Sequence, residues 1–237
     1  MVPEIAHHIT QRGNDRQIVF FSDDDRRLYL RLLTEHAAAH GTHILGYCLM
    51  TNHVHLVAIP ERADSLARTL GQTHSEYAQV VNRSQSRTGH LWQNRFFSCP
   101  LDPPHLENVV RYVDLNPVRA GLAASAWEWP WSSARAHCGA GAGDPVLDCD
   151  WERRAGPWGR AGWKERLSIE MAEEECAAVR RATWTGEPLG SAEFVRRLER
   201  VAGRRLRVYE CGRPRKKRGV GALEGVQECL FTNEVPL

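Results

Sequence analysis

The sequence has few of the features that mark specialised classes of protein. Its seven cysteines form no C-x-x-C pair, and their odd number does not fit a closed disulfide framework or a structural zinc knuckle. No stretch stays apolar over the roughly 20 residues that a membrane helix needs. The opening segment, "MVPEIAHHITQRGN", has no apolar signal core. We therefore expect a soluble, intracellular protein in a reducing compartment.

The net charge is also small, but the basic residues are unevenly distributed along the chain. The chain has 31 basic and 29 acidic residues and a net charge of +2. Residues 204–218 contain eight Lys or Arg and one acid, Glu210, which leaves 23 basic and 28 acidic residues elsewhere, a balance of −5. This asymmetry predicts contact with a polyanion through the basic segment. A solvated tail is the alternative, and charge alone does not separate the two.

The first 100 residues contain alternating strand and helix patterns in the order β-α-β-β-α-β. Ser22, followed by Asp25, predicts a helix start, and Gly41 predicts its end. The predicted elements are a strand within 7–21 broken by a turn at 13–14, a helix from 23 to 40, strands at 42–50 and 53–60, a helix at 65–82 and a strand within 89–101. This order is typical of an α+β, ferredoxin-like fold, an antiparallel sheet with helices on one face.

A third helix and a change of composition organise the rest of the chain. The helix begins near Asp102, which is a suitable N-cap residue and is followed by two prolines. It ends at or near Asn116, because Pro117 disfavours helical geometry in the residue before it. From Trp151 the composition shifts to Arg, Glu and Trp and predicts a helical C-terminal extension. We therefore divide the chain into a main domain at 1–138, a linker at 139–150, a small helical region at 151–203 and a basic, flexible tail at 204–237.

Two histidines open one of the predicted strands. Side chains alternate along a strand, so His53 and His55 share a face and lie about 7 Å apart. Two imidazoles in this position can bind one divalent metal ion. The pair alone is weak evidence, because core histidines bonded to backbone groups have the same pattern. Val57 continues the face and supplies no third ligand.

The third helix carries polar groups that could complete such a site. Tyr112 and Asn116 are four residues apart and share a helical face. Taken singly, the tyrosine is an ordinary ring at a helix edge and the asparagine an ordinary helix stop. Together with His53 and His55 they indicate a metal-assisted phosphoryl transfer, in which the tyrosine oxygen attacks phosphorus and stays covalently linked to it. A link that conserves the bond energy is typical of a strand transferase.

The sequence also resembles a known family, the single-tyrosine HUH transposases, and within it most closely the REP-associated tyrosine transposases of the IS200-like type. The resemblance covers nearly the whole chain up to about Lys217. It is carried by "HHITQRGN" at 7–14, "YCLMTNHVHL" at 47–56, "TGHLWQNRF" at 88–96, "YVDLNPVRAGL" at 112–122, "WPWSS" at 129–133 and "TGEPLGSAEFVRRLE" at 185–199.

The resemblance implies a function for each of these residues, with 1–138 as the catalytic domain. Tyr112 would be the nucleophile that forms a 5′-phosphotyrosine. His53, His55 and Asn116 would hold a divalent ion, Mg²⁺ or Mn²⁺, although some relatives have glutamine where this chain has Asn116. The implied partner is single-stranded DNA folded into hairpins by imperfect palindromes, in the bacterial cytoplasm at the nucleoid. A homodimer and a monomer both remain open.

Several residues are candidates for DNA contact. Arg12 and Asn14 lie in a predicted turn that could bind a phosphate or a hairpin base. Trp92 and Arg95 belong to a segment that mixes aromatic and basic groups, as stacking platforms for unpaired bases do, but a core position explains Trp92 equally well. The segment "GRPRKK" resembles the Arg-Pro-Arg centre of an AT-hook and predicts salt-dependent phosphate binding. Its basic residues are Arg213, Arg215, Lys216 and Lys217.

Two other functions compete with the strand transferase. One is a DNA- or RNA-binding protein on a ferredoxin-like sheet, without chemistry. The other is a metal-dependent hydrolase that uses His53 and His55 with water and gives Tyr112 no special role. The joint presence of His53, His55, Tyr112 and Asn116 favours the transferase.

Overall fold

A four-stranded antiparallel sheet forms the centre of the computed structural model, which describes residues 1–140, 143–155 and 162–206. Its strands are β1 (His7–Arg12), β2 (Thr42–Leu49), β3 (His53–Pro60) and β4 (Phe97–Pro100), in the spatial order β2-β3-β1-β4. Every pair of neighbours runs antiparallel. The order of elements up to β4 is β-α-β-β-α-β, so the predicted α+β, ferredoxin-like fold is confirmed.

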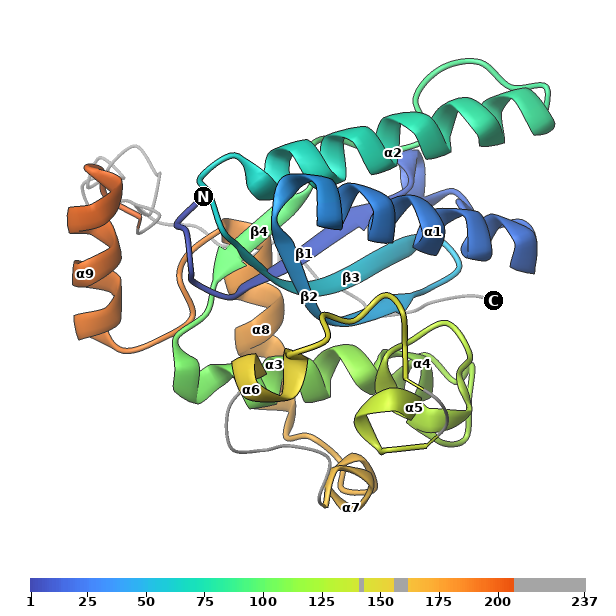
Figure 1. Cartoon of the computed structure of the whole chain (residues 1–237). Helices are drawn as coiled ribbons and strands as arrows, with labels where there is room; N and C mark the ends of the chain where they lie inside the picture. Colours follow the sequence, from blue (N-terminus) through green and yellow to red (C-terminus); the bar gives the residue numbers. More distant parts are fainter. Residues whose placement is uncertain (141–142, 156–161, 207–237) are drawn as a thin grey trace, which may run out of the picture. The chain divides into compact units, whose positions relative to one another are not determined.

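Two long helices, α1 (Asp23–His40) and α2 (Ser65–Ser84), pack together over one face of this sheet (Figure 1). The first begins as the sequence predicts. The Ser22 hydroxyl accepts a hydrogen bond from the Asp25 N–H, and the Asp25 carboxylate accepts one from the Ser22 N–H. It ends at Gly41, whose φ of 64° is a left-handed conformation that glycine adopts without strain.

The third helix, α3 (Pro103–Asp114), covers the opposite face and contacts β2 and β3 (Figure 1). It stops before Pro117, as predicted, but Leu115 leads directly into a further helical turn, α4 (Asn116–Arg119). Asp102 occupies the N-cap position without capping through its side chain. Its carboxylate instead accepts a hydrogen bond of 3.0 Å from the N–H of Ser191, at the start of another helix.

Two predicted strand segments have other structures. After β1 the chain forms a 3-10 turn, η1 (Asn14–Arg16), and "QIVFF" adds no strand. Val19 and Phe20 are buried core residues, and both donate their N–H groups to the carbonyl of Thr51. Of residues 89–101, only Phe97–Pro100 forms a strand of the sheet. The preceding residues form a loop, in which the side chains of Leu91 and Trp92 are buried in the core.

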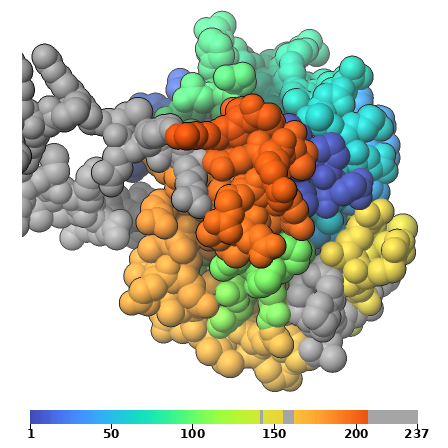
Figure 2. Space-filling view, turned by 90° about the vertical axis from the view of Figure 1, so that its left-hand side faces the viewer, coloured from blue at the N-terminus to red at the C-terminus, as the bar shows by residue number. Residues whose placement is uncertain are grey.

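The remaining elements are all helical. They are η2 (Ala126–Glu128), α5 (Ala134–His137), α6 (Trp151–Ala155), α7 (Trp163–Leu167), α8 (Glu173–Thr185) and α9 (Ala192–Ala202). Helix α8 packs against β1, β4 and α3, so this helical extension shares the hydrophobic core of the sheet. Helix α9 is capped by Ser191 and ends at Gly203, as predicted. Figure 2 shows α9 beside the N-terminal residues and the start of α3. No described helix combines the length and apolar character that crossing a membrane requires.

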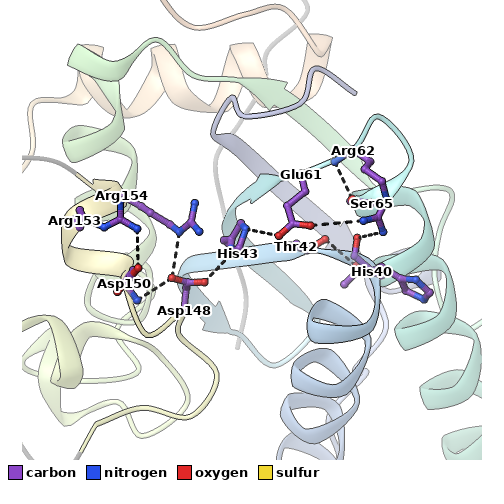
Figure 3. A network of polar contacts seen from close by, with 11 residues as sticks. His40, Thr42, His43, Glu61, Arg62, Ser65, Asp148, Asp150, Arg153 and Arg154 are labelled. Carbon is purple, nitrogen blue, oxygen red and sulfur yellow. Dashed lines mark hydrogen bonds and ion pairs between the residues drawn. The ribbon is translucent and has the colours of Figure 1, made fainter.

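The open edge of β2 is covered by later parts of the chain. The hydroxyl of Ser133 accepts a hydrogen bond from the N–H of Tyr47, and the N–H of Asp148 donates to the carbonyl of Ile44. Figure 3 shows His43 of β2 between two carboxylates, with Nδ1 2.6 Å from Asp148 and Nε2 3.1 Å from Glu61. These contacts fix residues 144–154 against the sheet and block pairing with another strand at this edge.

Candidate active site

The histidines of β3 lie on the face of the sheet that α3 covers. Their ring centroids are 5.0 Å apart, with the planes 76° from each other. In the register with β1, His53 is paired with Arg12, and His55 is paired with Thr10. The side chain of His55 is 7% exposed, and His53 is more accessible. The shared face that alternation predicts is therefore present, with the ring of His55 buried and that of His53 partly buried.

Helix α3 brings Tyr112 to these histidines within a single chain. The ring of Tyr112 lies 5.9 Å from that of His55 and 5.9 Å from that of His8, in edge-on geometry to both. The guanidinium of Arg119 covers the tyrosine ring, with Cζ 4.4 Å from the ring centroid. The other tyrosines of the described chain have structural partners, such as the bond of 2.6 Å from Tyr77 to the carbonyl of Val19.

Asn116 is one turn beyond Tyr112 and has one polar atom available. Its Nδ2 donates to the carbonyl of Tyr112 at 3.0 Å, which orients the amide. Its Oδ1 forms no hydrogen bond with the described residues. No three His, Cys, Asp or Glu side chains of the described chain are placed to hold a metal ion together. A divalent ion at the two histidines would therefore need a different third ligand, and an amide oxygen is suitable.

The proton on His53 is placed by its neighbour. The Nδ2 of Asn52 donates to the carbonyl of Arg16 at 3.0 Å, so Oδ1 of the same amide faces His53. This oxygen lies 2.7 Å from Nδ1 of His53 and can only accept. Nδ1 therefore carries the hydrogen, and Nε2 of the neutral ring has its lone pair free for a metal ion.

Burial keeps these imidazoles neutral. It lowers the pKa of His53 to about 3, an effect that the neighbouring charge of Arg12 strengthens. Burial lowers the pKa of His8 to about 3 as well. The pKa of His55 is well below its usual value, because the ring is buried and other cations lie nearby. At neutral pH all three rings are in the uncharged form that binds metal ions.

Three of the residues predicted to contact DNA line one groove. Asn14, Trp92 and Arg95 lie along a groove of about 860 Å³ between the loop at 89–96 and helix α2. Asn14 and Arg95 are exposed, whereas Trp92 is 9% exposed and donates from its indole N–H to the carbonyl of His74. The ring packs against Tyr29 and His74. Most of the surface of Trp92 is therefore used in the core, as the alternative to a DNA-stacking role predicts.

The other predicted contacts are divided between the site and the tail. Arg12 is exposed at the end of β1, opposite His53. Partial burial of the guanidinium is the main cause that lowers its pKa, and the neighbouring charge of Arg16 acts in the same direction. The basic residues of the tail, Arg213, Arg215, Lys216 and Lys217, lie outside the described residues.

Sequence reasoning missed three residues of the site. His8 alternates with Thr10, which is paired with His55, so strand parity could have placed it on the same face. Arg119 lies seven residues after Tyr112, about two helical turns, and this spacing was a usable signal. Thr183 contacts His8 from 175 residues away, and no local pattern indicates it.

Comparisons with known proteins point to transposases. Residues 1–116 match the family model described as IS200-like transposase. Among solved structures, a REP-associated tyrosine transposase bound to a REP hairpin matches with a TM-score of 0.51 and 17% identity, over 62% of this chain and 90% of that chain. At this identity the likeness shows the fold. No curated protein matches the chain. The part of the chain that is similar to IS200-like transposases, residues 1–116, contains both histidines of β3, Tyr112 and Asn116.

Proposed function

We propose that this chain is a single-stranded DNA transposase that cleaves and rejoins strands at hairpin-forming palindromes, with Tyr112 as the nucleophile. One observation carries the proposal. The ring of Tyr112 contacts that of His55 within one chain, although 57 positions separate the two residues in the sequence. Because the site is assembled from one chain, we infer that a monomer is sufficient for the first cleavage.

The residues at the site are suited to a divalent cation. His53 offers a free Nε2, and Asn116 offers an amide oxygen without another partner among the described residues. With His55 they would hold Mg²⁺ or Mn²⁺, both of which accept oxygen and imidazole ligands. When bound there, the ion supplies a positive charge that polarises an oxygen of the scissile phosphodiester.

Tyr112 then supplies the covalent chemistry. Its phenol oxygen attacks the phosphorus, an Oη–P bond forms, and the P–O3′ bond breaks. The phenol loses its proton, and the released 3′ oxygen gains one. Arg119, whose guanidinium lies over the ring, favours the negative charge that develops on the phenol oxygen. The phosphotyrosine keeps the energy of the broken bond, so another 3′-hydroxyl can reverse the step.

DNA is bound on two parts of the chain in this proposal. The groove with Asn14 and Arg95 accepts unpaired nucleotides beside a hairpin, because it combines a cation with polar side chains. The basic residues of the tail bind phosphates without regard to sequence. A hairpin as the substrate is supported by the solved transposase of the same fold, which is a complex with a REP hairpin.

A covalent adduct tests the proposal directly. A labelled hairpin oligonucleotide with single-stranded flanks is incubated with the protein and Mg²⁺, and the products are separated under denaturing conditions. We expect a labelled protein band that Tyr112→Phe abolishes and that Tyr209→Phe, the control in the basic tail, leaves unchanged.

Each other outcome supports a different function. An adduct that persists in Tyr112→Phe would exclude this tyrosine as the nucleophile. Cleavage without a trapped strand would favour the metal-dependent hydrolase. Tight binding that leaves the oligonucleotide intact would favour a DNA-binding protein without chemistry.

A further inference from the structure

His8 connects the site to the C-terminal helical region. It lies on β1, is 1% exposed, and lies edge to edge with the ring of His55, with the centroids 5.3 Å apart and the planes 7° from parallel. Its Nε2 lies 3.0 Å from Nδ1 of His55. Its other nitrogen, Nδ1, lies 2.7 Å from the hydroxyl of Thr183 on α8. Both ring nitrogens of this buried histidine are therefore engaged.

The direction of these hydrogen bonds follows from Thr183. Its hydroxyl donates to the carbonyl of Val179, one turn earlier in α8, at 2.8 Å. A hydroxyl has one hydrogen, so Oγ1 of Thr183 accepts from Nδ1–H of His8. Neutral His8 then has a lone pair on Nε2, which accepts from Nδ1–H of His55. The proton of His55 is thereby held on Nδ1, and its Nε2 is free of hydrogen.

We propose that Thr183 and His8 are positioning residues that hold His55 in the tautomer able to bind a divalent cation through Nε2. The inference rests on the proposed function in one respect, that His55 is a metal ligand. It adds that α8, which lies outside the matched residues 1–116, completes the site. The extension would then be required for metal affinity as well as for the packing of the sheet.

A packing role for Thr183 makes a different prediction. If the residue only fills space between α8 and β1, an isosteric valine preserves its function. If the hydrogen bonds matter, Thr183→Val leaves Nδ1–H of His8 without an acceptor. The proton of His8 then moves to Nε2, which donates to Nδ1 of His55, and the proton of His55 moves to Nε2, the nitrogen that would bind the ion.

The tautomer of His55 can be measured without metal. We would record ¹⁵N chemical shifts of the histidine rings by long-range ¹H–¹⁵N spectra of the metal-free full chain. We expect His55 to be protonated at Nδ1 in the wild type and to shift toward Nε2 in Thr183→Val. Thr183→Ser restores the hydroxyl and should restore the wild-type spectrum. Thr185→Val is the control, since that hydroxyl bonds to α8 carbonyls and to Glu187.

Mn²⁺ titration of the same proteins by calorimetry gives the second result. We expect the affinity to fall about 10- to 100-fold in Thr183→Val, the range for outer-shell partners of a metal ligand, and to recover in Thr183→Ser. A His55 tautomer that is unchanged in Thr183→Val overturns the inference. A wild type that binds no Mn²⁺ while the tautomer does shift overturns the proposed metal site and leaves the role of Thr183 and His8 standing.

Discussion

The guanidinium of Arg119 lies over the ring of Tyr112, with Cζ 4.4 Å from the centroid. A cation on an aromatic face contributes about 0.5–2 kcal/mol, and more as negative charge develops on the phenol oxygen. Arg119→Gln keeps a polar side chain and removes the charge. We expect the rate of adduct formation to fall about 10-fold, which corresponds to about 1.4 kcal/mol of activation free energy.

Single-turnover kinetics with a labelled hairpin check this prediction. Arg153→Gln removes an exposed cation of α6 that pairs with Asp150, and it serves as the control. Equal rates for Arg119→Gln and the wild type would mean that the contact between the ring and the guanidinium has no part in catalysis.

The second prediction concerns the amide of Asn116. Its Nδ2 is bound to the carbonyl of Tyr112, and its Oδ1 is the proposed third ligand of the metal ion. We expect Asn116→Ala to weaken Mn²⁺ binding by more than about 10-fold, because loss of a direct ligand costs at least as much as loss of an outer partner. The fold should persist. Calorimetric titration measures the affinity.

Asn108→Ala is the matched control for this substitution. Asn108 is a partly buried asparagine of α3, and its amide faces Glu175 at 3.4 Å. If both alanine variants bind Mn²⁺ like the wild type, the third ligand lies elsewhere.

The third prediction concerns stability beneath the site. The carboxylate of Asp114 is fully buried and accepts hydrogen bonds from Ser133, His137 and Trp163 at 2.7–3.1 Å. Removing it leaves three buried donors without this partner. We expect Asp114→Ala to lower the free energy of unfolding by about 3–5 kcal/mol, or the melting temperature by roughly 10 °C.

Urea denaturation and thermal melting measure these changes. Asp114→Asn should cost less, because its amide keeps one acceptor for these donors. Asp150→Ala removes an exposed ion pair with Arg153 and should change the free energy by less than about 1 kcal/mol. A loss for Asp114→Ala as small as that of the control would contradict the assigned role.

The fourth prediction is a pH dependence of stability. The ring of His74 is bonded to the hydroxyl of Tyr29 at 3.0 Å, and burial lowers its pKa to about 3. In the unfolded chain a histidine has a pKa of about 6.5. Between these values the unfolded state binds the additional proton, so the free energy of unfolding decreases as pH falls. The slope is about 1.4 kcal/mol per pH unit for this residue.

Urea denaturation at pH 6, 5 and 4 tests this assignment. His74→Gln should reduce the dependence on pH by about that slope, whatever the substitution costs at pH 7. His90→Gln, at an exposed histidine, controls for the change of residue type. A variant at position 74 with the full wild-type slope would show that His74 is not kept neutral by burial.

The fifth prediction concerns the groove beside α2. Arg95 is exposed there, together with Asn14. We expect Arg95→Gln to weaken binding of a hairpin with single-stranded flanks and to reduce the salt slope by about 0.7, the value for one lost contact with a phosphate of a single strand. Fluorescence anisotropy at several salt concentrations provides both numbers.

Arg31→Gln is a suitable control, because Arg31 lines a separate cavity of about 870 Å³ beside α1. If Arg31→Gln has the larger effect on binding, DNA lies at the cavity beside α1. If neither variant changes the salt slope, phosphate contacts come from other parts of the chain.

Local sequence signals predicted the elements where local contacts decide them. The capping box of Ser22 and Asp25 and the left-handed Gly41 bound α1 as expected, since a helix end depends on a few adjacent residues. The loop at 89–96 was mistaken for a strand because its aromatic residues have high strand propensity. Its Trp92 instead packs in an aromatic cluster with Tyr29 and Tyr77.

The sequence by itself determined the order of strands and helices, the common face of His53 and His55, and the spacing of Tyr112 and Asn116 on α3 and α4. These features depend on the period of side chains along a strand or a helix, which is a local property of the chain. Only the tertiary structure decided that Tyr112 meets the histidines of its own chain, that Arg119 covers its ring, and that Thr183 contacts His8. Such contacts depend on how distant segments share one hydrophobic core, because packing and burial join residues that no periodic pattern relates.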